Sequence, residues 1–474
     1  MKLKKLLKDL DVDVKGSREI EVTGISSHSQ FVSPGSLFIA KRGGTFDGTE
    51  FIPKAIETGA VAVLTDFYNP FLQGIVQVVT PNVTKLEALL AKRYYGTENS
   101  PLFLIGITGT NGKTTTAYLI HHLLPKCGLM GTIETIIGKQ RFPAQLTTAD
   151  VVTNHKVLKE MAEEGLKAAV MEATSHALDQ NRVEEVKFDV GVFTNFSQDH
   201  LDYHGSMDAY LDAKLKLFDQ SKLAIYNQDD PTAEKFAEGV TYAIDSSADL
   251  KAENISISIE GTTFDLLYKN RVVKIASPLI GRYNVYNVLA AFAVLLSKGE
   301  SLASMKKKLM TFPGVPGRLE RIENPQGIHL FVDFAHTPEA LLKVLETLEG
   351  IKRGKIITIF GCGGERDEGK RFLMAEAAEK YSDQVIVTSD NPRGEDPLKI
   401  CNEIAKGLKR EVLIEVDRRS AIERGIFMAE KNDTVLIAGR GHEPFQKIGG
   451  RRIPFDDRQV AYAISHLTLD KKDC

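Results

Sequence analysis

Cysteine is scarce in this 474-residue chain, and its four cysteines lie far apart in the sequence. Cys127, Cys362, Cys401 and Cys474 form no CxxC pair and show no spacing typical of metal ligands. This scarcity excludes a disulfide-stapled secreted scaffold and a cysteine metal site. We therefore expect reduced thiols in a cytosolic protein.

Long apolar runs are also missing. The longest, Val288 to Leu296, is far shorter than the roughly 20 residues that cross a bilayer. The start of the chain is basic and apolar, but Lys8, Asp9 and Asp11 interrupt any signal-peptide core. We expect a cytoplasmic protein without a membrane partner.

A strong excess of one charge is absent as well. The chain has 60 Lys and Arg against 63 Asp and Glu, for a formal net charge of -3. This balance gives no reason to expect nucleic acid as a partner. The sequence shows neither an internal repeat nor a low-complexity segment. Separately, we expect the protein to be a monomer.

Turn-rich segments divide the chain into three regions, which we predict to be separate domains. Residues 1–97 mix short β-like runs with turns. Residues 98–316 follow the polar break Tyr95 to Pro101, and residues 317–474 follow the hinge Pro313 to Gly317. Strands and helices alternate in the second and third regions, which predicts an α/β fold with mostly parallel sheets. The third region is Rossmann-like but lacks a GxGxxG after its first strand, so we expect no dinucleotide there.

The expected elements follow from apolar runs and alternation. An alternating stretch at 254–275 predicts an antiparallel appendage, and 284–297 predicts a helix. We expect strands at 103–108, 168–173, 189–194 and 223–227 in the second region, and at 329–334, 355–360, 384–389, 412–416 and 434–438 in the third.

A phosphate-binding loop follows the first strand of the second region. It reads Gly109-Thr110-Asn111-Gly112-Lys113-Thr114-Thr115. Small residues let backbone N–H groups surround phosphates, and the next helix N-terminus favours negative charge. Lys113 is expected to reach the β- and γ-phosphates of ATP, and Thr114 to bind Mg²⁺. A strict Walker A motif would have glycine at Ile107, whereas this chain has Gly106 one position earlier.

Three further residues are candidates for the same site. Glu172 ends a strand beside the loop, as a metal-binding acid would. His200 follows the next strand, at the sheet edge where ligands bind. Lys214 shares the apolar stripe of a predicted helix at 207–218, although lysine is almost never fully buried without a partner. The alternatives are a solvated glutamate, a surface histidine and a snorkelling lysine.

The loop GTNGKTT, the run TNFSQDHLDYH and the helix YLDAK resemble the Mur ligase family, over essentially the whole chain. The resemblance implies a uridine-binding N-terminal domain, a central P-loop ATP-binding domain and a C-terminal amino-acid-binding domain. In that family the lysine matching Lys214 is carbamylated by CO₂, and its carboxylate joins the Mg²⁺ site. The implied metal ligands are Thr114, Glu172, His200 and carbamylated Lys214. The implied catalytic residues are Lys113, Glu172, His200, Lys214 and Arg318.

The resemblance also implies contacts to the other substrates. For ATP these are Asn284 and Asn287 at the adenine, with Arg318, Asp333 and His336; N-capping is the alternative for Asn284. For UDP-N-acetylmuramoyl-L-alanyl-D-glutamate they are Ser29, Thr147, Thr148, Thr174, Gln180 and Arg182, and an ordinary β-turn is the alternative for the two adjacent threonines. His28, Gln30 and Gly44 depart from the family pattern around the uridine.

A third set of residues resembles the amino-acid pocket of the tripeptide-synthesising branch of the family. The set is Arg366, Asp390, Asn391, Pro392, Arg393, Gly439 and Glu443. Asp390 to Arg393 has the form found in members that add meso-diaminopimelate, which differs from lysine by a second carboxylate. A guanidinium can hold that carboxylate in a bidentate pair. The alternative for Asp390 to Arg393 is a simple proline turn after a strand. The alternatives for the function of the protein are a family ligase that adds L-lysine or another amine, and a non-catalytic ATP-binding switch protein.

Overall fold

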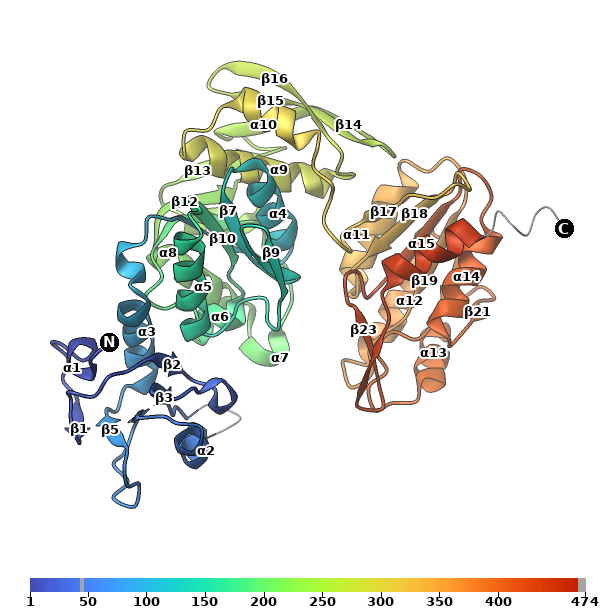
Figure 1. Cartoon of the computed structure of the whole chain (residues 1–474). Helices are drawn as coiled ribbons and strands as arrows, with labels where there is room; N and C mark the ends of the chain where they lie inside the picture. Colours follow the sequence, from blue (N-terminus) through green and yellow to red (C-terminus); the bar gives the residue numbers. More distant parts are fainter. Residues whose placement is uncertain (43–46, 468–474) are drawn as a thin grey trace. The chain divides into compact units, whose positions relative to one another are not determined.

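The computed structural model describes residues 1–42 and 47–467. Gly44 and Cys474 therefore lie outside the described residues. Contacts divide the chain into two compact units (Figure 1). Unit 1 holds Met1–Leu250 and Asn287–Ser301, and unit 2 holds Lys251–Tyr286 and the chain from Leu302 onward. The three domain ranges predicted above stay a prediction.

Unit 1 begins with a small sheet in the order β1-β5-β4-β3-β2. Its strands β2 to β5 are parallel, and β1 is antiparallel to β5. Successive residues of β3 point to opposite faces, so Leu37 packs with α1 and α3 while Phe38 packs with α2. The elements are α1 (Leu3–Leu6), β1 (Asp13–Lys15), β2 (Gly24–Ser26), η1 (Ser29–Phe31), β3 (Ser36–Ile39), η2 (Gly48–Phe51), α2 (Ile52–Glu57), β4 (Ala62–Thr65), β5 (Val76–Val79), α3 (Val83–Tyr95) and η3 (Thr97–Asn99).

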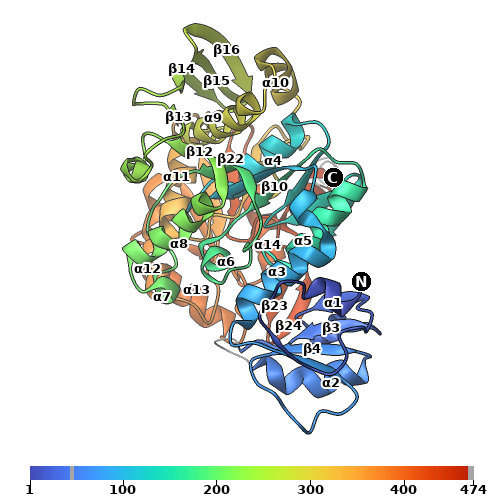
Figure 2. The same ribbon diagram turned by 90° about the vertical axis from the view of Figure 1, so that its left-hand side faces the viewer.

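The central strands of unit 1 lie in the order β13-β12-β11-β6-β10-β7-β8-β9. Figure 2 labels β10, β12 and β13 among them. Strands β13 to β7 in that order are parallel, and β8 and β9 are antiparallel. Because β6, β10 and β11 are neighbours, the loops after these three strands meet at one edge. The elements are β6 (Phe103–Thr108), α4 (Lys113–Leu123), β7 (Cys127–Met130), β8 (Glu134–Ile137), β9 (Gln140–Pro143), α5 (Val151–Glu163), β10 (Ala168–Glu172), α6 (Ser175–Asp179), β11 (Phe188–Phe193), α7 (Leu201–His204), α8 (Met207–Asp219), β12 (Ser221–Asn227), η4 (Pro231–Lys235), β13 (Val240–Ala243) and, from Asn287 onward, α9 (Arg282–Ser297).

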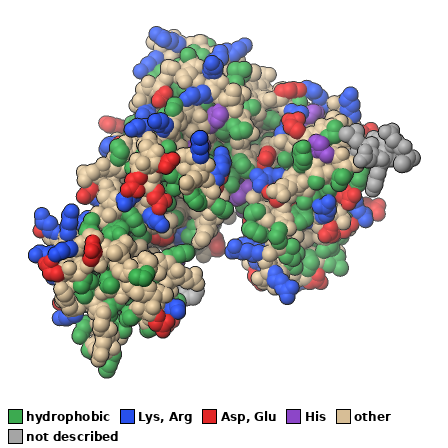
Figure 3. All heavy atoms as spheres, viewed as in Figure 1, with side chains coloured by type: hydrophobic (Ala, Val, Ile, Leu, Met, Phe, Trp, Pro, Cys, Tyr) green, Lys and Arg blue, Asp and Glu red, His purple; other side chains and the backbone are tan. Residues whose placement is uncertain are grey.

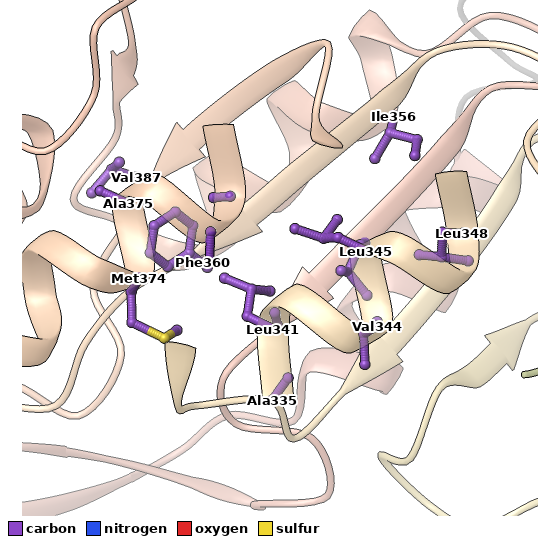
Figure 4. Close-up of a cluster of buried hydrophobic side chains, with 14 of the residues drawn as sticks. Ala335, Leu341, Val344, Leu345, Leu348, Ile356, Phe360, Met374, Ala375 and Val387 are labelled. Carbon is purple, nitrogen blue, oxygen red and sulfur yellow. The ribbon is translucent and has the colours of Figure 1, made fainter. Parts of the chain in front are cut away.

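Unit 2 contains antiparallel strands and a second, mostly parallel sheet in the order β17-β18-β22-β19-β20-β21. Its core on one face lies under α11 and α12, where Figure 4 shows Leu341 beside Phe360. Helices α14 and α15 cover the other face. The elements are β14 (Leu250–Ser258), β15 (Gly261–Tyr268), β16 (Arg271–Ser277), α10 (Leu302–Leu309), β17 (Glu320–Ile322), β18 (His329–Asp333), α11 (Pro338–Glu349), β19 (Ile356–Phe360), α12 (Gly369–Tyr381), β20 (Gln384–Val387), α13 (Pro397–Ala405), β21 (Leu413–Ile414), α14 (Arg418–Met428), β22 (Thr434–Ala438), β23 (Phe445–Ile448), β24 (Arg451–Pro454) and α15 (Asp457–Leu467).

These elements confirm the predicted α/β class. The strand expected at 412–416 is shorter than predicted, because β21 is an edge strand that pairs with β20 on one side only. Cys127, Cys362 and Cys401 are buried free thiols. Within residues 1–42 and 47–467, no helix combines the length and apolar character needed to cross a bilayer.

Candidate active site

The phosphate loop joins β6 to α4 and needs glycine at two positions. Gly109 has φ +137°, and a Cβ there would lie 1.9 Å from Oγ1 of Thr194. Gly112 has φ +85°, and a Cβ there would lie 2.4 Å from Oδ1 of Asn287. Both the backbone conformation and the close neighbours therefore exclude a side chain.

Gly106, the glycine that departs from the Walker A spacing, has a different role. It lies inside β6, where a Cβ would come within 2.7 Å of Cδ1 of Leu217 in α8. Gly106 therefore allows a close approach of helix to strand and does not belong to the loop.

Lys113, Thr114 and Glu172 meet at the loop. Nζ of Lys113 donates to the carbonyls of Gly109 and Thr110, both at 2.8 Å. Oγ1 of Thr114 donates to Oε2 of Glu172 at 2.9 Å. The Glu172 side chain is fully buried, and Thr132 donates to it from its backbone N–H at 2.8 Å and its hydroxyl at 2.9 Å. A hydroxyl and a carboxylate are thus held together beside the phosphate loop.

Lys214 is buried in α8 and reaches the same loop. Its side chain is 1% exposed, and its Nζ donates to the carbonyl of Gly109 at 2.8 Å. Nζ also lies 4.3 Å from the centre of the Tyr210 ring. Burial, aided by the positive charge of Lys113, lowers the pKa of Lys214 well below its usual value. A neutral amine is the nucleophilic form of lysine, which is the form that adds CO₂.

His200 stands next to two histidines that the sequence did not single out. Its ring centre lies 4.7 Å from that of His176 and 6.1 Å from that of Tyr210. His204 lies 5.1 Å from Tyr210 and 5.4 Å from His176, measured between ring centres. Burial and the neighbouring histidines lower the pKa of His176 to about 4, and burial lowers the pKa of His200. Neutral imidazoles can accept hydrogen bonds or bind a metal ion.

The donor set fits Mg²⁺ when ATP is present. Thr114 and Glu172 offer oxygen ligands at the loop, and Mg²⁺ usually takes only one or two protein carboxylates together with phosphate oxygens and water. Outside residues 43–46 and 468–474, no group of three or more His, Cys, Asp or Glu side chains is arranged to hold a metal ion.

Four of the six residues expected to hold the UDP-linked acceptor form one hydrogen-bonded group in unit 1. Oγ1 of Thr148 donates to the carbonyl of Glu172 at 2.7 Å and lies 3.4 Å from Oγ1 of Thr174. Arg182 donates to Oε1 of Gln180 and to the carbonyl of Thr148. This group therefore borders the Glu172 site. Thr147 is half-buried next to Thr148, and Ser29 lies in η1 beside the small N-terminal sheet.

The two asparagines of α9 have different partners. Oδ1 of Asn287 accepts from Oγ1 of Thr116 at 3.3 Å. Nδ2 of Asn284 donates to the carbonyl of Ile280 at 2.8 Å. Asn284 is not an N-cap, because α9 begins at Arg282.

In unit 2, three of the residues expected to bind ATP lie just before β17 and at the end of β18 or just after it. The carboxylate of Asp333 accepts from the backbone N–H groups of Leu319 at 2.5 Å and Ala335 at 2.7 Å. The Arg318 guanidinium lies 4.7 Å from the centre of the Phe334 ring, and Nδ1 of His336 lies 2.8 Å from the Phe334 carbonyl. Burial raises the pKa of Asp333 despite the charge of Arg318. Arg318, Asp333 and His336 are therefore near neighbours.

Two loops bring together residues that are expected to bind the amino-acid substrate. We call these loops, residues 390–393 and 439–443, the amino-acid loops. Nδ2 of Asn391 donates to Oε2 of Glu443 at 2.7 Å. A Cβ on Gly439 would lie 2.7 Å from Oδ2 of Asp390. Arg393 adopts φ +53° and donates to the carbonyl of Gly364, in the loop that carries Arg366. Arg366 itself is exposed, and Pro392 is buried.

Three parts of the chain match known protein-family domains. Residues 21–93 match the Mur ligase family catalytic domain, residues 107–295 the Mur ligase middle domain, and residues 317–441 the Mur ligase glutamate ligase domain. The chain belongs to the Mur ligase family. It is 44% identical to the UDP-N-acetylmuramoyl-L-alanyl-D-glutamate--2,6-diaminopimelate ligase of Chlamydia felis, with 98% of this chain and 99% of that protein covered. The protein of the same name from Geobacillus thermodenitrificans is 40% identical, with 94% of each chain covered.

Solved Mur ligase structures share the fold. One structure of a UDP-N-acetylmuramoyl-L-alanyl-D-glutamate--2,6-diaminopimelate ligase has a TM-score of 0.72 and 32% identity, with 100% of this chain and 99% of that chain covered. The MurF ligase of Thermotoga maritima in complex with ADP has a TM-score of 0.66 and 20% identity, with 95% of this chain and 98% of that chain covered. The second likeness concerns the fold alone.

Some contacts of this Mur ligase site were not predicted. Thr194 and Asn195 hold the phosphate loop through Asn111. Oγ1 of Thr194 donates to the carbonyl of Asn111 at 2.6 Å, and Oδ1 of Asn195 accepts from the backbone N–H of Asn111 at 2.9 Å. Thr132 completes the hydrogen bonds of Glu172. The sequence analysis identified the run 194–204 as a candidate site segment. Hydroxyl and amide side chains at a strand end, however, do not reveal in the sequence which loop they will contact.

Proposed function

We propose that this Mur ligase joins meso-diaminopimelate to UDP-N-acetylmuramoyl-L-alanyl-D-glutamate, using ATP. The observation that carries the proposal is 40–44% identity, over nearly the full length, to relatives named for that reaction. The amino-acid loops support it, because Arg393 and Glu443 offer groups of opposite charge for a diamino dicarboxylic acid.

The first chemical step is activation of the acceptor. The terminal carboxylate of the acceptor attacks the γ-phosphorus of ATP, which gives an acyl phosphate and ADP. Lys113 and the backbone N–H groups of the loop would bind the phosphates and stabilise the charge that develops on them. Thr148, Thr174, Gln180 and Arg182 would hold the acceptor beside Glu172.

Mg²⁺ is the cofactor of this proposal. Thr114, Glu172, His200 and carbamylated Lys214 would hold it, and when bound it supplies positive charge to the phosphoryl oxygens. The burial of Lys214 and its lowered pKa support the carbamylation, because CO₂ adds to the uncharged form of the amine.

The second step forms the amide. The amine of meso-diaminopimelate attacks the activated carbonyl, and phosphate leaves from a tetrahedral intermediate. We assign Arg393 and Arg366 to carboxylates of the amino acid and Glu443 to an ammonium group. Asp390, Asn391, Pro392 and Gly439 would shape the pocket. Arg318, Asp333, His336, Asn284 and Asn287 would bind ATP, and Ser29 would bind the uridine.

The test is phosphate release with ATP, Mg²⁺ and the UDP-linked dipeptide, comparing meso-diaminopimelate with L-lysine. We expect release that depends on meso-diaminopimelate, with little from lysine, and a product heavier by one diaminopimelate residue in mass spectrometry. Equal release with lysine would contradict the proposed specificity but not the ligase activity. Binding of ATP without release under any of these conditions would favour a non-catalytic protein.

The setting of the reaction is also part of the proposal. We propose that the enzyme works in the cytoplasm, as a monomer, without nucleic acid or membrane as a partner. The buried, unpaired thiols of Cys127, Cys362 and Cys401 support a reducing compartment.

A further inference from the structure

Three charged side chains lie fully buried next to the amino-acid loops. Arg418 begins α14, Asp457 begins α15, and Arg440 belongs to the second loop. All three side chains have 0% exposure. Burial of an ion pair is weak evidence for stability, because the desolvation cost can exceed the Coulomb gain. Stability alone therefore does not account for the burial of these three charged side chains.

Asp457 is shared by the two guanidinium groups. Arg418 binds it in a bidentate pair, from Nε to Oδ1 at 2.8 Å and from Nη2 to Oδ2 at 2.7 Å. Nη1 of Arg440 also donates to Oδ1, at 3.3 Å. The planar guanidinium of Arg418 is thereby held in one orientation.

The other hydrogen bonds of Arg418 reach the beginning of both amino-acid loops. Nη1 donates to the carbonyl of Ser389 at 3.2 Å, and Nη2 donates to the carbonyl of Ala438 at 3.0 Å. Ser389 directly precedes Asp390, and Ala438 directly precedes Gly439. One rigid group therefore links the two residues that directly precede the amino-acid loops.

Arg440 extends the same network to a carboxylate of the site. Its Nε lies 3.9 Å from Oε2 of Glu443, the oxygen that accepts from Asn391 of the other loop. Nη2 of Arg440 donates to the carbonyl of Phe455 at 3.1 Å. A displacement of Arg440 would change the position of Glu443 relative to Asn391.

We propose that Arg418, held by Asp457, is a positioning residue for the amino-acid substrate and sets the separation of the two amino-acid loops. Arg440 assists by orienting Glu443. The inference rests on the proposed function, since it takes these loops as the binding site of meso-diaminopimelate. Lysine cannot replace Arg418, because a single ammonium lacks the planar fork that reaches one carboxylate and two carbonyls together.

The experiment compares Michaelis constants for all three substrates in the full-length enzyme. In Arg418→Lys we expect the KM for meso-diaminopimelate to rise about 10- to 100-fold, because small misplacements of binding groups have effects of that size. The KM values for ATP and the UDP-linked dipeptide should stay within about twofold of wild type, because Arg418 links only the amino-acid loops. Arg440→Lys should show the same selective rise, but a smaller one.

Arg424→Lys is the matched control. Arg424 lies on the same helix and pairs with Glu415 at 3.1 Å, but its side chain is 54% exposed. We expect all three KM values to be unchanged in this variant.

The outcomes separate the inference from the proposed function. Wild-type enzyme without diaminopimelate-dependent phosphate release would overturn both. An active wild type with an unchanged KM for meso-diaminopimelate in Arg418→Lys would overturn the inference alone. A fall in kcat with all KM values unchanged would do the same, because it would indicate a loss of folded enzyme only. If Arg418→Lys does not fold, Arg440→Lys decides by the same criteria.

Discussion

At the scale of single residues, Lys214 combines deep burial with a pKa that burial lowers well below its usual value. The carbonyl of Gly109 accepts a hydrogen bond from this amine, so any group added to Nζ lies at the phosphate loop. Carbamylation would place an anion at that position, which is the charge a Mg²⁺ site needs.

We predict that Lys214→Ala lowers kcat about 10³-fold or more, in line with the loss of a group that stabilises the transition state. Formate or acetate added to the assay should restore part of the activity by supplying a carboxylate. The control is Lys216→Ala, whose lysine is exposed on the same helix and pairs with Asp179 at 2.8 Å. Full activity of Lys214→Ala would remove carbamylation from the mechanism.

Arg393 is the residue that should distinguish meso-diaminopimelate from lysine. For Arg393→Ala we predict a fall in kcat/KM of about 100-fold with meso-diaminopimelate, because one partner of a charge pair is lost. The much lower activity expected with L-lysine should change by less than about threefold, since lysine has no carboxylate at that end. Arg419→Ala, which removes an exposed arginine from unit 2, serves as the control. Equal losses with both amino acids would contradict a selective role.

At the scale of elements, the phosphate loop depends on close packing against α9 and on the run after β11. We predict that Gly112→Ala raises the Kd for ADP more than about 100-fold, because the added Cβ meets Asn287 and the residue must keep a positive φ. Calorimetric titration with ADP measures the effect.

Gly165→Ala is a control for a glycine with a positive φ outside the phosphate loop. Gly165 also has a positive φ, +78°, but a Cβ there would have nothing within 4 Å. We expect this variant to bind ADP like the wild type, with only a small loss of stability. Similar ADP affinities for the two variants would contradict the prediction for Gly112→Ala.

Helix α5 carries a histidine whose burial makes unit 1 sensitive to acid. His155 is 1% exposed, its Nδ1 lies 2.6 Å from Oγ1 of Thr97, and burial lowers its pKa to about 4. In the unfolded chain a histidine has a pKa of about 6.5. As the pH falls below that value, the unfolded state takes up the proton first, so stability is lost until the folded state also protonates near pH 4.

We predict that this single group removes about 3 kcal/mol of stability between pH 7 and pH 4. In thermal unfolding experiments, His155→Gln should therefore show a flatter decrease of Tm over this range than the wild type. His28→Gln, which changes an exposed histidine, should keep the wild-type slope. A wild-type slope in His155→Gln would assign the acid sensitivity to other groups.

At the scale of the whole molecule, the surface gives little reason for self-association. Positive and negative side chains are interspersed over the face shown in Figure 3. Four of the exposed large apolar side chains come from four different parts of the chain, namely Phe71 before β5, Val272 in β16, Leu398 in α13 and Tyr462 in α15. We predict that light scattering gives the mass of one chain at micromolar concentration. A stable dimer under these conditions would contradict the proposed monomer.

Much of the architecture could be predicted because its signals are local. The apolar runs of β6, β10 and β18 and the turn-forming residues between them determine strands and helices within a few positions. The phosphate loop was also readable, since its glycines and lysine are consecutive. Parallel neighbours place strand ends at one edge, so even the meeting of the loop with Glu172 was expected.

The remaining features were decided by contacts between distant parts of the chain. Lys214 and Gly109 are 105 positions apart, and Arg418 and Asp457 are 39 apart. The sequence by itself determined the element types, the loop and the candidate residues, because spacing and side-chain chemistry are local properties. Only the tertiary structure decided which charges are buried, and thus the lowered pKa of Lys214 and the link from Arg418 to both amino-acid loops, because desolvation and hydrogen bonding depend on what packs around each group.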